Sequence, residues 1–170
     1  MSEMLGNYYF QKRDYYSAIL QYEGLPKFIH LNNSVKKKLI ICYAQQNNVE
    51  KSLELFTDLI STDINIIVRT NHEDEMCPCP DLIYEFENNS FNSSNDFEQI
   101  VLLGILWLYC NIYKSFNYLN KASLMKPENK NLIKVLRIIS DEIIQLEKKQ
   151  NHNRKGDHNA KKSNKKRFSS

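Results

Sequence analysis

The chain is 170 residues long, a length typical of a single folded domain that buries a sizeable core. It holds only four glycines and four prolines, which favours helices over sheets with many turns. The formal net charge is +3, and the longest apolar run, Ile100–Cys110, is too short for the roughly 20 residues of a membrane-spanning helix, so we expect no membrane span.

Charge is distributed unevenly along the chain. Residues 148–170 hold nine Lys or Arg and one acid, so this stretch carries about +8 and leaves −5 for residues 1–147. No Lys or Arg lies between Arg69 and Lys114, whereas eight acids fall within residues 73–98. The sequence therefore predicts an acidic body with a basic tail.

The N-terminal residues and the cysteines indicate the compartment. Met1-Ser2-Glu3 lacks the positive charge of a signal peptide, so none is expected. Two of the four cysteines, Cys42 and Cys110, fall within helical patterns, which favours a reducing environment. We predict a cytoplasmic protein.

Helical periodicity predicts four helices in the first 65 residues. They cover about residues 2–12, 14–24, 33–46 and 48–61. Asp14 and Asn48 are suitable N-caps for the second and fourth, and Gly24 with Pro26 stops the second. The four helices are expected to form two hairpins.

The two hairpins share one residue pattern with a period of 34. Three pairs are in step at this period: Tyr9 and Tyr43, Ala18 and Ser52, Tyr22 and Phe56. The order of residue types resembles the tetratricopeptide repeat, a helix–turn–helix unit of this length. In such a unit small residues sit where the two helices cross, so we expect Gly6, Ala18 and Ser52 at helix crossings.

Residues 66–95 break the period and are predicted to be an irregular insertion or a decayed repeat. Ile66–Thr70 is a candidate helix start, and Pro80 suits the first position of a short helix through Glu87. Asn88–Asn95 is rich in Asn and Ser and is expected to be a loop.

A third, looser match to the repeat follows. Its first helix is predicted over Phe97–Cys110. Counting back along the repeat places Leu103 at the small position and Gly104 one residue off, which a shortened turn near Asn111 would explain. The matching residues of its second helix and terminal proline are Ser115, Leu119, Ala122 and Pro127.

A long amphipathic helix to about Lys149 is expected to cap the stack, because repeat arrays need a polar outer face. Its apolar stripe consists of Leu132, Leu136, Ile139, Ile143 and Leu146. Residues 150–170 contain almost nothing to bury and are predicted to be a disordered basic tail.

The predicted fold is therefore all-α: a right-handed α-solenoid of antiparallel helix hairpins over residues 1–149, followed by the tail at 150–170. The resemblance implies a concave groove, lined by the first helix of each repeat, that binds a peptide or helix of a partner protein. The groove residues that it implies are Asn7, Phe10, Gln11, Lys37, Ile41, Ala44, Gln45, Ile100, Trp107 and Leu108. The alternative for several of them, above all Trp107, is plain core.

The expected function is that of a protein-binding adaptor or small chaperone without enzymatic activity. A carboxylate clamp, used by one variant of the family, is not expected, because only Asn7 matches it and Glu3 sits where a lysine belongs. The second repeat also resembles a pentatricopeptide repeat, which suggests single-stranded RNA binding as the alternative, aided by the basic tail. Against RNA, the body is acidic.

His72, Cys77 and Cys79 raise the question of a soft metal ion, but a rigid loop is preferred, because no fourth ligand is evident. No catalytic motif, phosphate-binding loop or cofactor site is expected. The tail has three interpretations: a solubilising extension, a charged contact for nucleic acid or a membrane surface, or a segment that folds back on residues 73–98. The partner and the oligomeric state are not predicted.

Overall fold

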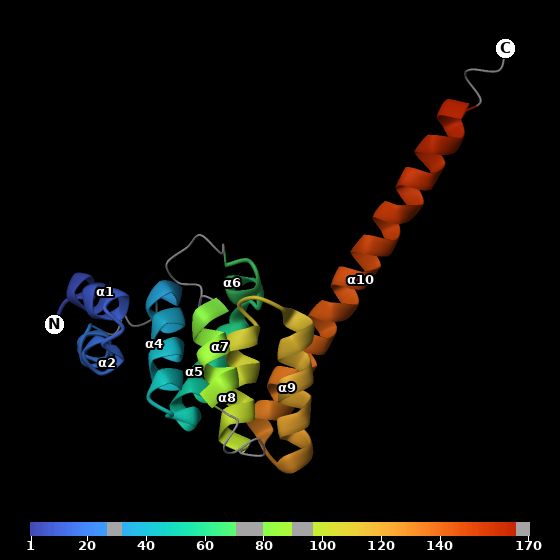
Figure 1. Cartoon of the computed structure of the whole chain (residues 1–170). Helices are drawn as coiled ribbons and strands as arrows, with labels where there is room; N and C mark the ends of the chain where they lie inside the picture. Colours follow the sequence, from blue (N-terminus) through green and yellow to red (C-terminus); the bar gives the residue numbers. More distant parts are fainter. Residues whose placement is uncertain (27–31, 71–79, 90–96, 166–170) are drawn as a thin grey trace.

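The computed structural model describes residues 1–26, 32–70, 80–89 and 97–165 (Figure 1). Within these residues all regular structure is α-helical and no strand occurs, which confirms the predicted all-α class. The helices are α1 (Glu3–Gln11), α2 (Tyr15–Glu23), α4 (Asn33–Gln45), α5 (Val49–Thr62), α6 (Asn65–Val68), α7 (Pro80–Asn89), α8 (Phe97–Trp107), α9 (Ile112–Met125) and α10 (Lys130–Lys165).

The pairs α1–α2 and α4–α5 close through the same turn. Arg13 and Asn47, 34 positions apart, adopt the left-handed backbone conformation with φ of 59° and 52°. The next residue donates its backbone N–H to a tyrosine carbonyl of the preceding helix, at 3.0 Å for Asp14 and 2.9 Å for Asn48. The side chain of that residue then caps the second helix, accepting a backbone N–H at 3.1 Å for Asp14 and 3.2 Å for Asn48. Both predicted N-caps are confirmed.

The α8–α9 pair closes through a different turn, because four residues (108–111) separate its helices, whereas three residues separate the helices of each other pair. Gly104 precedes the N-cap Asn111 by seven positions, whereas Gly6 precedes Asp14 by eight. The Asn111 side chain accepts two backbone N–H groups of α9, each at 3.0 Å. A β-carbon at Gly104 would lie 2.5 Å from Cγ of Leu119, so Gly104, and not Leu103, occupies the small position, although the turn itself is not shortened as predicted.

Small residues lie at the crossings of all three hairpins. A β-carbon at Gly6 would lie 2.6 Å from the Tyr22 ring, and Ala18 is fully buried. The buried hydroxyls of Ser52 and Ser115 donate to backbone carbonyls of the preceding helix, at 3.1 Å and 2.7 Å. The three hairpins are thus held by close helix contacts at the predicted positions.

Two helices lie in the described part of the segment 66–95, whereas residues 71–79 and 90–95, with most of the predicted Asn88–Asn95 loop, lie outside the described residues. The described part contains the end of α6 and all of α7, and α7 begins at Pro80 as predicted. Ile67 and Ile83, from α6 and α7, are buried in the same large apolar cluster as α4, α5, α8, α9 and α10. These two helices are therefore part of the packed body.

The C-terminal helix α10 packs against α5 and α9 through the buried Leu132, Val135 and Ile139. Leu136, Ile143 and Leu146 are partly buried on the same core, in agreement with the predicted stripe. The expected end near Lys149 differs from the structure, in which α10 continues to Lys165 and its far half projects away from the body (Figure 1). Residues 166–170 of the predicted tail lie outside the described residues. No proline interrupts residues 130–165, so the backbone meets no strong stop signal there.

Candidate functional site

Four of the ten predicted groove residues lie in the core. Ile41, Ala44, Ile100 and Leu108 are between 0 and 5% exposed and belong to the large apolar cluster. Because that cluster also contains residues of α6 and α7, the face expected to be an open groove is covered in part by the chain itself. These four residues present almost no surface to a partner.

Two polar groove residues are hydrogen-bonded within the molecule, and the amide nitrogen of a third is buried. Oδ1 of Asn7 accepts hydrogen bonds from the Tyr22 hydroxyl at 2.8 Å and from the Lys38 ammonium at 2.7 Å, and thus joins α1 to α2 and α4. Lys37 is only 8% exposed, and its ammonium donates to the Thr70 hydroxyl at 3.4 Å. Nε2 of Gln45 is buried and has no hydrogen-bond partner among the described residues.

The remaining groove residues do not share one open surface. Phe10 is partly buried and meets Tyr15 edge-to-face at 6.1 Å, whereas Gln11 is exposed. Trp107 is half-buried, and its indole N–H donates to the carboxylate of Glu87 on α7 at 3.1 Å. The ten residues are therefore distributed between core, internal hydrogen bonds and the contact with α7.

An open cavity of about 350 Å³ lies elsewhere, between α2, α4 and α5, and we call it the α4 cleft. The partly exposed Leu55 contributes apolar surface, whereas Leu39 lines the cavity but is only 1% exposed. On α4, at 3.6 residues per turn, Leu39 and Tyr43 lie roughly opposite Ile41 and Gln45, so the cleft is on the other side of this helix from the predicted groove. The full lining consists of Glu23, Leu39, Tyr43, Lys51, Glu54, Leu55 and Asp58.

One end of the α4 cleft is a hydrogen-bonded triad. The carboxylate of Glu23 accepts from the Tyr43 hydroxyl and pairs with the Lys51 ammonium at 3.0 Å. The same ammonium lies 5.2 Å from the centre of the Tyr43 ring. Burial, together with the hydrogen bond to Glu23, raises the pKa of Tyr43 well above its usual value, so its hydroxyl stays protonated and keeps donating.

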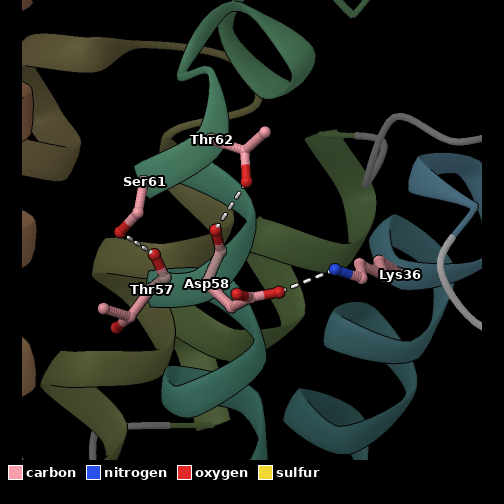
Figure 2. A network of polar contacts seen from close by, with 5 residues as sticks. All are labelled: Lys36, Thr57, Asp58, Ser61 and Thr62. Atoms are coloured by element: carbon pink, nitrogen blue, oxygen red, sulfur yellow. Dashed lines mark hydrogen bonds and ion pairs between the residues drawn. The ribbon is translucent and has the colours of Figure 1, made fainter.

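The other end is an ion pair between α4 and α5. The Lys36 ammonium lies 2.6 Å from the carboxylate of Asp58, and Figure 2 shows the lysine reaching across from α4. The hydroxyls of Ser61 and Thr62 donate to the carbonyls of Thr57 and Asp58, one turn back along α5. The Lys36 side chain is 14% exposed and Asp58 is 61% exposed, so the carboxylate still faces solvent at the cleft edge.

The charges of the lining favour a positively charged ligand. Glu23, Glu54 and Asp58 are acidic, whereas Lys51 is the one basic lining residue. Glu54 is exposed on α5, between the two ion pairs. A ligand that places an apolar side chain on Leu55 would therefore bring its polar groups to a mainly acidic rim.

Residue types alone did not indicate this cleft. Its leucines and Tyr43 have the spacing of ordinary core positions, and its charged residues have the spacing of a solvated helix face. The available signal was that two consecutive helices each place residues of the cleft on one face. These positions are 36, 39 and 43 on α4, and 51, 54, 55 and 58 on α5. That signal has meaning only once the register of the hairpin is known.

Other predicted features concern metal, membrane and thiols. His72, Cys77 and Cys79 lie outside the described residues, and within those residues no group of three or more His, Cys, Asp or Glu is placed to hold a metal. None of the described helices is long and apolar enough to cross a membrane. Burial raises the pKa of the Cys42 thiol to about 12, so that thiol is protonated at neutral pH.

No protein-family model matches this sequence, and neither a curated protein nor a solved structure matches it.

Proposed function

We propose that the chain is a non-enzymatic binding scaffold of tetratricopeptide-like hairpins, and that it holds a segment of a partner protein in the α4 cleft. The observation that supports this proposal is the cleft itself: an open cavity of about 350 Å³ with leucines at its base and charged residues at both ends. Clefts with apolar walls and a few placed polar groups are the usual form of a binding site.

The partner segment that fits is amphipathic and basic. Its apolar side chain packs on the partly exposed Leu55, and a Lys or Arg reaches Glu54 on the rim. Glu23 and Asp58 are already paired with lysines of this chain, which leaves Glu54 as the rim carboxylate for which no pairing is observed in the described structure. Binding of this kind weakens with added salt, because exposed charges are screened.

The test is selection of peptides from a random library displayed on phage, followed by affinity measurement with charge-reversed variants. Glu54→Arg changes the cleft rim, and Glu50→Arg is the matched control, because Glu50 is also exposed on α5 but does not line the cleft. We expect selected peptides to combine apolar and basic residues, and to bind Glu54→Arg at least tenfold more weakly than the control, a change of about 1.4 kcal/mol.

Equal binding to Glu54→Arg and Glu50→Arg would refute the α4 cleft as the site. Affinity capture from a cell extract, with and without nuclease, then separates protein from RNA as the natural ligand. A captured protein that survives nuclease and is lost with Glu54→Arg supports the proposal. Captured material that disappears with nuclease would support RNA binding instead.

A further inference from the structure

Helix α7 lies against α8 (Figure 1) and presents one apolar side to the body. Ile83 is 3% exposed and belongs to the large apolar cluster, and Phe86 is partly buried against the same cluster. Tyr84 is 68% exposed and faces away. The helix is thus a short amphipathic element whose buried positions are three residues apart.

A carboxylate fixes the end of α7 to two other helices. Oε1 of Glu87 accepts from the indole N–H of Trp107 on α8 at 3.1 Å and from the hydroxyl of Tyr118 on α9 at 3.0 Å. The ammonium of Lys114 lies 3.7 Å from the centre of the Trp107 ring and adds positive charge beside this pair. Burial, with a contribution from Glu87, raises the pKa of Tyr118, so the phenol remains a donor.

The donors belong to the hairpin and the acceptor belongs to α7. If α7 leaves, the N–H of Trp107 and the O–H of Tyr118 lose a negatively charged acceptor, and half-buried donors without acceptors are costly. The surface therefore selects for a carboxylate next to an apolar contact. Two weaker attachments remain: Gln99 on α8 donates to the backbone carbonyl of Phe86 at 3.5 Å, and an ion pair at 3.5 Å between Glu85 and Arg13 has both side chains more than half exposed and contributes little.

We propose that the surface of α8 and α9 beneath α7 is a second binding surface, specific for a short acidic amphipathic helix of a partner protein, and that α7 occupies it as an internal competitor. The partner helix carries apolar side chains at the positions of Ile83 and Phe86 and a carboxylate at the position of Glu87. This surface shares no residue with the α4 cleft, so the two proposals stand or fall separately.

Trp107 is the only tryptophan of the chain and reports directly on this surface. The probe is a capped synthetic peptide of residues 80–89, added to the full-length protein. Ile83→Asp expels α7, because it places a charge at a buried position. Tyr84→Asp is the matched control, since it introduces the same charge at the neighbouring exposed position of the same helix.

We expect Ile83→Asp to shift the Trp107 emission to longer wavelength and to bind the peptide at least tenfold more tightly than the wild type or Tyr84→Asp, because its surface is vacant. Binding of the peptide should return the emission toward the wild-type spectrum. A peptide with Glu87→Gln should bind about tenfold more weakly, because the charged acceptor is lost.

Three outcomes would overturn the proposal. The first is a folded Ile83→Asp chain that binds the peptide no better than the control. The second is peptide binding that is indifferent to Glu87→Gln. The third is loss of helical circular dichroism in Ile83→Asp beyond the ten residues of α7, which would make α7 an integral part of the core.

Discussion

Replacing Gly104 with alanine tests the close contact between α8 and α9. An added β-carbon would lie 2.5 Å from Cγ and 2.6 Å from Cδ2 of Leu119, and 3.2 Å from its backbone nitrogen. Carbon atoms in good contact are about 3.5–4.0 Å apart, so the new β-carbon and the Leu119 side chain must move apart by roughly 1 Å. Rotation of the leucine side chain does not move its backbone nitrogen, so α8 and α9 must also separate slightly.

Separation of the two helices weakens a second interaction. The Ser115 hydroxyl donates to the carbonyl of Gly104 at 2.7 Å, and a buried hydrogen bond of this kind contributes about 1 kcal/mol. Overpacking adds about 1–3 kcal/mol, and the better helix propensity of alanine returns about 1 kcal/mol. We expect Gly104→Ala to lower the free energy of unfolding by roughly 2 kcal/mol and the Tm by roughly 4–8 °C.

The measurement is urea and thermal unfolding followed by circular dichroism. Gly24→Ala is the control, because the atoms nearest to its added β-carbon belong to the flexible side chain of Met1, which is 77% exposed. In the double variant with Leu119→Ala the clash is absent, so the loss should be smaller than the sum of the two single losses. A Gly104→Ala protein as stable as the wild type, or more stable, would show that the contact is looser than described.

Three further predictions concern the hairpins. Asn7→Ala removes an acceptor shared by a tyrosine of α2 and a lysine of α4, and should lower the free energy of urea unfolding by about 1–3 kcal/mol; no loss would mean that this bridge does not stabilise the fold. Ser52→Ala and Ser115→Ala should each cost about 0.5–1.5 kcal/mol in the same assay and add in the double variant, since they lie in different hairpins; strong coupling would contradict this. The Cys42 thiol has its pKa raised from 9.0 to about 12, so the unfolded chain ionises first and stability should fall as the pH rises from about 9 to 12, less steeply in Cys42→Ala; an identical slope in both proteins would refute the assignment.

The hairpins were predictable because their signals are local. Asp14 and Asn48 cap helices from one position before the first helical residue, and Gly6 and Ser52 mark crossings within single hairpins. Each signal acts over fewer than 20 residues and repeats with the period of 34, so neighbouring signals support one another. The small position of the third hairpin was only partly readable: Gly104 is seven positions before Asn111 instead of eight, but the turn between α8 and α9 is longer than in the other hairpins and not shorter as predicted.

The candidate site was less predictable because it depends on contacts between distant segments. The family pattern assigns Ile41 and Ile100 to a groove by analogy, and nothing near either residue in the sequence indicates that α6 and α7 share their core. The helix over Pro80–Glu87 was expected, but its burial was not, because Ile83 and Phe86 fit a surface helix equally well. The α4 cleft likewise appears only when two helix faces are set in register.

Electrostatics distinguishes the two proposed surfaces. Residues 1–147 carry a formal charge of −5, which attracts a basic segment to the α4 cleft and repels an acidic helix from the surface beneath α7. Added salt screens both long-range effects. It should weaken binding at the α4 cleft, where Glu54 is exposed, but it should leave unchanged or strengthen the binding of an acidic helix, whose carboxylate is held at short range by Trp107 and Tyr118. If the two surfaces are separate sites, added salt should weaken the binding of the basic segment but not that of the acidic helix. If both ligands shared one site, salt would change the two affinities in the same direction.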